Sequence, residues 1–246
     1  MIGLSQSSRT ILAALLASVA TPALAQSAPA ASDTDAAAND DVVVTAQRRE
    51  ERLKDVPISV AALSAERLTV VQAGGNDIRN LAGRVPSLNV ESSFGRAFPR
   101  FYIRGLGNSD FDLNASQPVS LVYDDVVLEN PILKGFPIFD LQRVEVLRGP
   151  PGTLFGRNTP AGIVKFDTVR PSTGGGYIRG GYGSFGTVNL EAAASIKLSE
   201  TLSARFSTIY QRRDNWVDNV ATPQRGALDG YTESRGRSSN GSRPRL

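Results

Sequence analysis

The sequence contains neither cysteine nor histidine among its 246 residues. Without cysteine there is no disulfide and no thiolate metal site, and without histidine there is no Ser-His-Asp triad and no histidine-ligated haem. Net charge is also scarce, because 27 Lys and Arg against 24 Asp and Glu leave only +3. That balance gives no electrostatic case for nucleic-acid binding. The composition therefore argues against an enzyme and predicts no metal ion and no cofactor.

What the chain does have is a hydrophobic content of 41% and enough length for one large or two modest domains. Its N-terminus has the layout of a secretory signal peptide over residues 1–25. The apolar run ILAALLASVA at 11–20 is too short to span a bilayer, and Ala23 and Ala25 form a small-x-small cleavage site before Gln26. The alternative is a buried N-terminal helix. Export without cysteine fits a bacterial cell envelope.

Three short segments of different composition follow the signal peptide. Residues 26–40, QSAPAASDTDAAAND, are small, polar and acidic, which predicts a disordered linker. DVVVTA at 41–46 is a short β-prone run, and QRREERLK at 47–54 is a solvated charged stretch. The residues alone leave open whether 41–46 joins a sheet of this chain or a sheet of another protein.

Residues 50–168 predict a small α+β domain of short strands and two short helices. Ser64 is placed to cap a helix that ends at 74–75, and Asn76 to cap a second one. Alternating apolar residues predict strands, two of them joined by a hairpin through Asp124-Asp125. These strands are expected around residues 58–62, 88–90, 101–103, 119–123, 126–128, 143–147 and 163–166.

The pattern changes over residues 175–232. A glycine-rich segment at 176–185 precedes two alternating segments, 187–198 and 201–211, in which apolar residues share one face and polar residues the other. Segments of about ten residues with this alternation are typical of transmembrane β-barrel strands. The same alternation fits a soluble antiparallel sheet. Residues 233–246 lose it and are expected to form an irregular tail.

Taken in order, these blocks resemble the start of a TonB-dependent outer-membrane receptor. The resemblance covers roughly 41–232 and rests on DVVVTAQRREE, DVPISVAALSAERL, FYIRGLGN, VSLVYDD and, above all, QRVEVLRGPPGTLFGRNTPAGIVKF. It implies a globular plug inside an outer-membrane barrel of about 22 strands. The implied fold is an α+β plug domain, a small mixed sheet with short helices, followed by the first antiparallel strands of an incomplete transmembrane β-barrel.

The resemblance also implies a role for the β-prone run. Its residues match the TonB box, the segment that the energy-transducing protein TonB grips from the periplasm. An extended peptide can add to a partner's sheet edge through main-chain hydrogen bonds, which would explain a strand without a sheet of its own. The opposing interpretation makes this run the plug's own first strand. The residues concerned are Asp41, Val42, Val43, Val44, Thr45 and Ala46.

Two further sets of plug residues follow from the resemblance. In the family, matching charged residues contact the inner barrel wall, so a docking role is expected for Arg143, Glu145 and Arg148, with a solvated charged face as the alternative. Turns and close backbone approaches are expected at Gly105, Gly149, Gly152, Gly156 and Gly162. The sequence departs from the family at Asp125, where glycine is commoner.

The implied function is a ligand-gated importer rather than an enzyme. Its partners would be TonB, outer-membrane lipid, the barrel strands missing from this chain and a small ligand such as a ferric siderophore. Relatives import vitamin B12, sugars and other metals instead. Segments 92–100 and 107–117 are loops that could face the ligand. The implied location is the cell outer membrane, or the periplasm if the barrel cannot form.

The length of the chain leads to one more expectation, and two other interpretations compete with the receptor. Unpaired sheet edges in hydrocarbon cost several kcal/mol per backbone group, so a chain of 246 residues is expected to be the N-terminal portion of a longer transporter, as a fragment or a broken coding sequence. A soluble periplasmic binding or signalling module made of the plug alone is one rival. The other is a dinucleotide-binding enzyme, because residues 181–186 fit G-x-G-x-x-G. That motif must open a helix, and residues 187–198 alternate as a strand.

Overall fold

The computed structural model describes residues 42–46, 48–110, 112, 114–151, 155, 159–171, 175–221 and 224–242. The predicted signal peptide at 1–25, with Ala23, Ala25 and Gln26, and the predicted linker at 26–40 lie outside these residues. Asp41 of the predicted TonB box and the predicted turn glycines Gly152 and Gly156 also lie outside them. All described residues belong to one unit that begins at Asp40.

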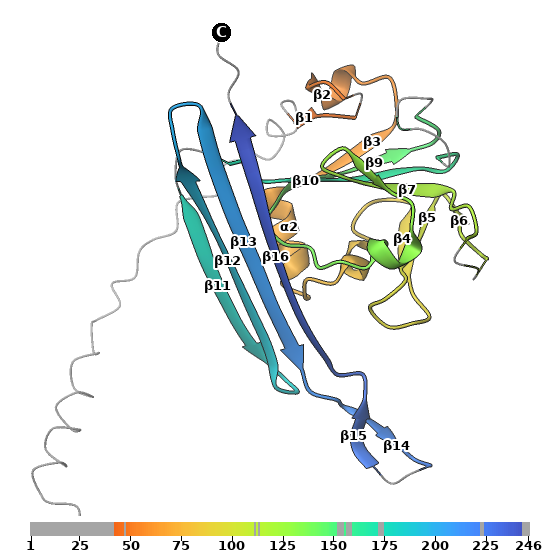
Figure 1. Cartoon of the computed structure of the whole chain (residues 1–246). Helices are drawn as coiled ribbons and strands as arrows, with labels where there is room; N and C mark the ends of the chain where they lie inside the picture. The colour runs from red at the N-terminus through yellow and green to blue at the C-terminus, as the bar shows by residue number, and fades with distance from the viewer. Residues whose placement is uncertain are drawn as a thin grey trace, which may run out of the picture. The chain divides into compact units, whose positions relative to one another are not determined.

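A five-stranded mixed sheet organises the predicted α+β region, with strand order β3-β9-β10-β7-β8 (Figure 1). The strands are β3 (Val60–Ser64), β7 (Val119–Tyr123), β8 (Val126–Leu128), β9 (Leu141–Arg148) and β10 (Gly162–Thr168). β10 runs parallel to β7, and the other neighbours are antiparallel. β9 and β10 lie inside the sheet, and their many β-branched residues suit strands covered on both faces.

β7 and β8 form the hairpin that the sequence predicts. Asp124 and Asp125 occupy its turn with φ of 46° and 69°, a left-handed conformation that aspartate tolerates. Asp124 Oδ1 also accepts the backbone N–H of Thr168 at 2.9 Å, which ties the turn to the end of β10. The predicted hairpin is confirmed, and Asp125 fits it where the family more often has glycine.

The helical segments are short. α2 (Ala65–Gln72) begins where predicted, because the Ser64 side chain accepts a backbone N–H from the first turn. A 3-10 helix follows at Ile78–Leu81. Its cap is Asp77, whose carboxylate accepts a backbone N–H at 2.8 Å, so the predicted cap at Asn76 is wrong. The Asn76 side chain instead donates to a backbone carbonyl at residue 138, at 2.8 Å.

A second, three-stranded antiparallel sheet and two further 3-10 turns complete the α+β region. The sheet consists of β4 (Leu88–Glu91), β5 (Arg100–Ile103) and β6 (Leu106–Gly107), and the turns span Leu53–Asp55 and Pro131–Lys134. The main hydrophobic core joins this sheet, α2 and the mixed sheet. A separate, smaller cluster of buried residues contains Val44, Ala46, Val60, Val122, Leu147, Phe155 and Ile163, and we call it the second core.

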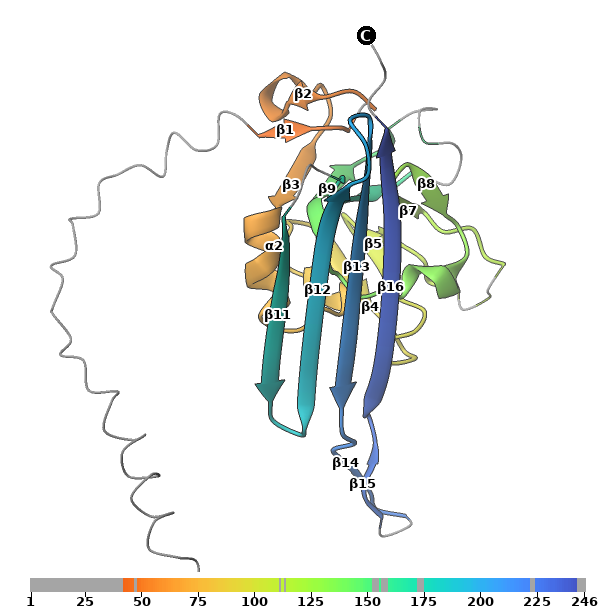
Figure 2. The same ribbon diagram turned by 60° about the vertical axis from the view of Figure 1, so that its left-hand side comes forward.

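Four long antiparallel strands follow the α+β region and lie side by side (Figure 2). They are β11 (Gly176–Gly183), β12 (Thr187–Lys197), β13 (Leu202–Arg213) and β16 (Tyr231–Ser242), and we call this sheet the wall. A small hairpin of β14 (Val217–Asn219) and β15 (Gln224–Leu228) extends beyond one end of them (Figure 1). None of the helices in the described ranges is long and apolar enough to cross a membrane.

The expectation of an irregular tail at 233–246 is wrong over its described part. β16 pairs with β13 along its whole length, from Tyr231 opposite Arg213 to Ser242 opposite Leu202. Strand pairing uses backbone N–H and C=O groups. A segment can therefore pair with the free edge of β13 even though its side chains show no apolar alternation. The wall therefore has one strand more than the sequence pattern predicts.

The G-x-G-x-x-G motif lies in a β-hairpin between β11 and β12. Its last residues, Phe185 and Gly186, have φ of 59° and 60° and turn the chain directly into a strand. A dinucleotide-binding loop requires a helix at that point, so residues 181–186 do not form such a loop. Among the described residues, no group of three or more His, Cys, Asp or Glu is placed to hold a metal ion.

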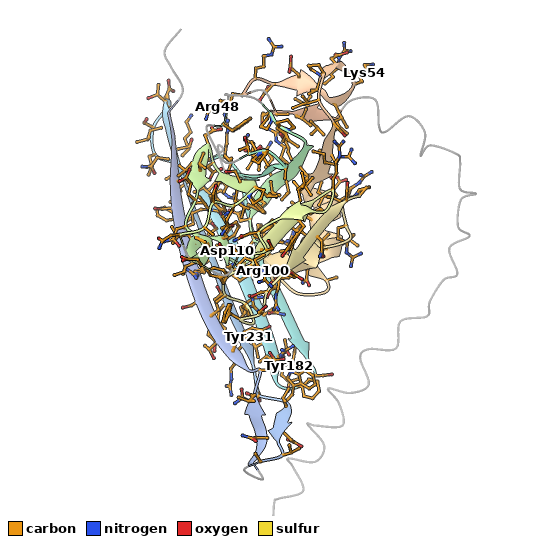
Figure 3. All side chains as sticks on the ribbon, turned by 90° about the vertical axis from the view of Figure 1, so that its right-hand side faces the viewer. Arg48, Lys54, Arg100, Asp110, Tyr182 and Tyr231 are labelled. Carbon is orange, nitrogen blue, oxygen red and sulfur yellow. The ribbon has the colours of Figure 1, made fainter. Side chains whose placement is uncertain are left out.

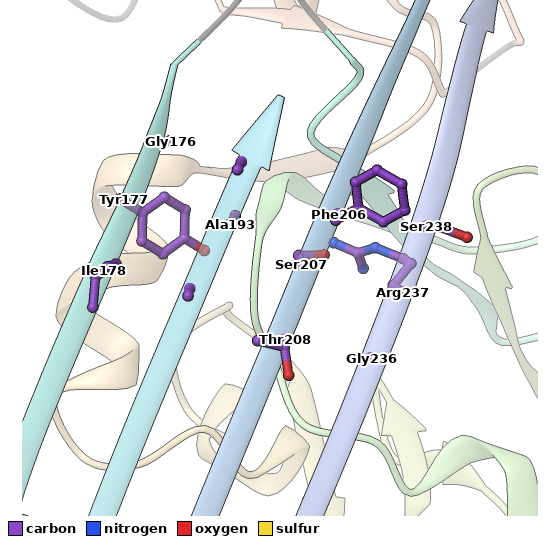
Figure 4. Close-up of a pocket in the computed structure, with 12 residues that line it drawn as sticks. Gly176, Tyr177, Ile178, Ala193, Phe206, Ser207, Thr208, Gly236, Arg237 and Ser238 are labelled. Atoms are coloured by element: carbon purple, nitrogen blue, oxygen red, sulfur yellow. The ribbon is translucent and has the colours of Figure 1, made fainter. Parts of the chain in front are cut away.

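In β12 and β13 the buried polar side chains of the wall lie on the face toward the α+β region. Glu191, Arg205 and Gln211 are buried there, whereas Leu190 and Phe206 on the opposite face are half exposed. The outward face also bears a shallow hollow of about 980 Å³, floored by small residues between Ile178 and Phe206 (Figure 4). This polarity is the reverse of a soluble sheet, and it is the arrangement of strands that contact lipid.

Candidate functional site

The predicted TonB box forms a small strand within this chain. We call its described residues, 42–46, the box. β1 (Val43–Val44) pairs antiparallel with β2 (Glu51–Arg52), and the backbone N–H of Leu53 donates to the Val42 carbonyl at 2.8 Å. The expectation that the run has no sheet partner of its own is therefore wrong. The partner, however, is a strand of only two residues within the predicted charged stretch.

The box is covered by apolar contacts on one side. Val44 and Ala46 are 0% and 1% exposed and belong to the second core, where they pack with Leu147 and Ile163 of the mixed sheet. Val43 points the other way and is 39% exposed. Burying one Val side chain contributes roughly 1.5–3 kcal/mol, so the attachment is modest in total.

Polar contacts from β9 and β10 hold the same segment. The Thr45 backbone N–H donates to Glu145 Oε1 at 2.7 Å, and the Thr45 hydroxyl lies 3.2 Å from the same oxygen. Lys165 Nζ donates to Thr45 Oγ1 at 2.5 Å. Arg143 Nη1 donates to the Val43 carbonyl at 3.1 Å. The Thr45 hydroxyl also lies 3.2 Å from Asp167 Oδ2, so two box residues, Val43 and Thr45, are bound by four charged side chains.

These charged groups form one cluster beneath the box. Arg143 Nε lies 3.2 Å from Glu145 and 2.9 Å from Asp167, and Lys165 lies 2.7 Å from Asp167. Burial raises the pKa of Glu145, and this outweighs the hydrogen bond from Thr45 and the attraction of Lys165 and Arg143. Burial also acts to raise the pKa of Asp167, but hydrogen bonds from Lys165 and Arg143 outweigh it, so that pKa is lowered.

Glu145 has a second oxygen that no described group satisfies. Its side chain is 0% exposed, and Oε2 has no hydrogen-bond partner within the described ranges. A buried anion with one unpaired oxygen depends on the contacts made by its other oxygen. The Thr45 N–H therefore stabilises Glu145 as much as Glu145 stabilises the box.

Two of the predicted docking residues contact the box among the described residues, and their docking on further barrel strands stays a prediction. The hydrogen bonds and ion pairs of Arg143 and Glu145, within the described part, go to the box and to Asp167 rather than to the wall. Arg148 sits at the end of β9, where its backbone N–H donates to a carbonyl at residue 59. Asp140, the residue just before β9, does form ion pairs with the wall. The sequence analysis does not predict this role.

Among the predicted turn glycines, Gly162 has the tightest surroundings. Its φ is 139°, and a Cβ there would clash with the carbonyl oxygen of Leu147 on the neighbouring strand. Gly149 and Gly105 also have positive φ, of 112° and 79°, but a Cβ at Gly105 would meet open space. Close backbone approach thus requires glycine at 162, whereas turn conformation alone favours it at 105.

The box lies at one end of the wall. A cavity of about 680 Å³ is lined by Thr45 of the box, by Lys165 and Arg143 of the cluster, and by wall residues Ser203 and Asn240. Figure 3 shows Arg48, just after the box, far from Tyr182 and Tyr231, which mark the other end of the wall. The box is therefore an extended segment docked at the end of the wall where β12 turns into β13.

Residues 52–163 match the family model described as TonB-dependent Receptor Plug Domain. Residues 52–163 belong to the plug-domain family of the TonB-dependent receptors. The matched range holds the mixed sheet up to the start of β10, so the α+β region is the plug and the wall corresponds to the antiparallel strands that follow a plug. The structure resembles this receptor fold, with the wall as an open sheet in the described residues.

Known proteins agree with this assignment. The chain is 34% identical over 145 residues to the pesticin receptor of Yersinia pestis, covering 58% of this chain and 21% of the receptor. It is 32% identical over 176 residues to the vitamin B12 transporter BtuB of Vibrio vulnificus, covering 69% of this chain and 26% of the transporter. The chain thus spans about a fifth to a quarter of these relatives.

A solved structure shows the same arrangement. The ferric yersiniabactin uptake receptor FyuA from Yersinia pestis superposes with a TM-score of 0.66 at 29% identity, over 74% of this chain and 28% of that one. The relatives are receptors and transporters rather than enzymes. The plug, the box that precedes it and the wall that follows are thus the parts from which a function must be argued.

Proposed function

We propose that this chain is the plug-bearing N-terminal part of a receptor that imports a scarce ligand across the outer membrane with energy delivered by TonB. The observation that carries the proposal is the docked box. It is an extended segment that precedes the plug and is held by a two-residue strand, two buried side chains and a few hydrogen bonds. Such a segment can be exchanged between this chain and a partner.

In the proposed mechanism TonB replaces β2 as the partner of the box. β-Augmentation uses the backbone N–H and C=O groups of an extended peptide, and Val42, Val43 and Val44 favour that conformation. While the box is docked, its outward-facing Val43 is the accessible part. Release breaks the Thr45–Glu145 hydrogen bond and withdraws Val44 from the second core. TonB then pulls on the plug from its N-terminal side.

We infer a ferric siderophore as the cargo. A relative of known structure is a ferric yersiniabactin uptake receptor, and that similarity supports iron uptake more than the vitamin B12 transport of a second relative. The loop at 92–100 has exposed Phe94 in edge-to-face contact with Phe98, at 5.8 Å between ring centroids. With the loop at 107–117, it is the part of the plug we assign to ligand contact.

The proposed location is the outer membrane, because the wall turns its apolar face away from the plug. The alternative is a soluble periplasmic module that uses the plug alone. The two differ in one measurable respect. A membrane receptor fractionates with the outer membrane, whereas the soluble module is recovered with the periplasm.

Capture by TonB tests the function directly. The periplasmic domain of TonB is immobilised and the full chain is passed over it, as wild type and with Val43→Pro or Val43→Ala. Proline removes a backbone donor, so we expect at least a tenfold loss of capture. Alanine keeps that donor and changes an exposed side chain, so capture should stay within about threefold. Equal capture of all three chains would refute β-augmentation as the means of engagement.

A further inference from the structure

Asp140 is one of the plug residues bound to the wall, together with Gln72, Asn76, Arg96 and Tyr123, and it alone among them is approached by side chains from all four wall strands within the described ranges. Its carboxylate is 0% exposed and receives two hydrogen bonds from Arg205 of β13, from Nε at 2.9 Å and from Nη2 at 2.5 Å. Arg205 also donates to Ser195 of β12 at 2.8 Å. A bidentate arginine–carboxylate pair fixes orientation as well as distance.

The other three wall strands reach the same residue. Arg237 of β16 donates to Asp140 Oδ2 at 3.1 Å and to the Asp140 carbonyl at 2.8 Å. The Tyr177 hydroxyl oxygen of β11 lies 3.5 Å from Oδ1, and Glu191 of β12 accepts the Asp140 backbone N–H at 3.3 Å. Figure 4 shows Tyr177 and Arg237 on the two outer strands of the wall. One plug residue thus contacts a side chain from each of the four strands.

The charges at this point are balanced. Two guanidinium groups, of Arg205 and Arg237, face two carboxylates, of Asp140 and Glu191, and Tyr177 donates to Glu191. Removing one member of a buried, balanced set leaves an unpaired charge, which is much more destabilising than replacing the whole set. The Asp140 backbone has φ of 50°, a conformation that persists only where surrounding contacts hold it.

The same strand carries the box contact. Asp140 immediately precedes β9, and Glu145, which holds Thr45, lies five positions further along. β9 is also hydrogen-bonded on both sides, to β3 and β10, so it is held more firmly than β3 at the sheet edge. The wall contact and the box contact therefore lie at different points of one rigid strand.

We propose that Asp140 is a positioning residue that fixes the plug against the wall, and that residues 140–148 carry two separable attachments, one to the wall at Asp140 and one to the box at Glu145. The box leaves without disturbing the wall contact, and the wall contact breaks without freeing the box. One consequence for import is that the box is drawn out while β9 stays in place, and this consequence rests on the proposed function. The existence of two separable attachments does not depend on the proposed function.

Two sets of introduced cysteines report on the two attachments in the full chain, purified in detergent. The natural sequence has no cysteine, so every thiol is an introduced one. For the wall, Gln72→Cys and Arg179→Cys replace side chains that lie 3.3 Å apart across α2 and β11, and a short bis-maleimide alkylates both thiols and joins them. For the box, Ala46→Cys places a thiol at a position 1% exposed, and its labelling rate rises when the box leaves.

Asp140→Asn should reduce the cross-link yield at least fivefold and leave the labelling rate of residue 46 within about twofold. Glu145→Leu removes the acceptor of the Thr45 N–H, and should raise that labelling rate at least tenfold with the cross-link yield unchanged. Asp214→Asn, which removes an exposed ion pair with Arg212, is the control and should change neither reporter. A variant that moves both reporters would overturn the separation.

General unfolding of the Asp140→Asn chain is distinguished by a second substitution. Asp140→Asn combined with Arg205→Gln removes the unpaired buried cation, and should recover at least part of the lost cross-link yield. If the double variant cross-links no better than the single one, the charge argument for Asp140 is wrong. None of these measurements uses TonB, so they can succeed when TonB capture fails, and the two proposals are judged apart.

Discussion

Glu145 accepts the backbone N–H of Thr45 at 2.7 Å, across 100 residues of sequence. This bond joins the segment that precedes the plug to the middle of its central sheet. It also uses the one oxygen of Glu145 that has a partner within the described ranges, because Oε2 is buried without one. The docked box and the buried carboxylate therefore stabilise each other.

Substitutions at Glu145 should separate the need for an acceptor from the need for a charge. Glutamine keeps an oxygen for the Thr45 N–H, and burial already disfavours the charged form, since the pKa of Glu145 is raised. Labelling of Ala46→Cys in the Glu145→Gln chain should therefore stay within about threefold of wild type. Leucine leaves a buried N–H unsatisfied at about 1–3 kcal/mol, so the box should be released. Equal labelling of both variants would contradict the acceptor argument.

Lys134 should make plug stability depend on pH. Its side chain is buried and donates to Gln117 at 2.6 Å, and burial lowers its pKa from 10.5 to about 8, against the attraction of Glu129. Between these two values the unfolded chain binds more protons than the folded chain, so stability rises with pH from about 8 to about 10.5. Urea unfolding followed by circular dichroism should show a gain of about 2 kcal/mol between pH 7 and pH 9.5.

The matched control for that measurement is Lys134→Met, which keeps an unbranched side chain without an amine. The gain attributed to this residue should disappear in the variant, while the contribution of other titrating groups remains. A methionine chain with the same pH dependence as wild type would show that another group is responsible.

Two glycines of positive φ should respond differently to alanine. Gly162→Ala pushes a Cβ into the Leu147 carbonyl, and we expect a loss of about 2–4 kcal/mol. Gly105→Ala meets open space and should cost about 1 kcal/mol, from the backbone conformation alone. Chemical unfolding of the two chains measures both values. Similar losses would mean that conformation, rather than the close approach of β9 and β10, sets the requirement at 162.

The outward face of the wall should tolerate charge poorly if it contacts lipid. Leu190→Arg places a cation on that face, where arginine costs about 2–4 kcal/mol near the bilayer centre. The share of the chain recovered with the outer membrane should fall. Leu133→Arg changes an exposed leucine of the plug, at 59% against 50% for Leu190, and should leave that share unchanged. Loss in both variants, or in neither, would contradict a lipid-facing wall.

The helix cap and the hairpin turn are the parts of the fold that the sequence predicts best. Ser64 caps α2 and Asp124-Asp125 turn the β7–β8 hairpin because the controlling residues lie within a few positions of what they control. The box was recognisable for a similar reason, as a short β-prone run in a defined order of blocks. Its pairing with Glu51–Arg52 was not, since two charged residues give no strand signal.

The wall contact could not be predicted because its members are far apart in the chain. Asp140 meets Tyr177, Glu191, Arg205 and Arg237 at separations of 37, 51, 65 and 97 residues, and no local pattern links them. The sequence pattern does not predict β16 for a related reason. Its outward positions are polar or small, and only the free edge of β13 shows that a strand belongs there.

The second core gives the docked box a role in solubility. Val44 and Ala46 cover Val122, Leu147 and Ile163, all of which are at most 1% exposed while the box is in place. Release of the box, as the proposed function requires, would uncover an apolar face of the kind that chaperones and proteases recognise. A chain whose box stayed outside would be prone to aggregation, so the proposed release must be brief, or the proposed partner must also cover the exposed apolar face.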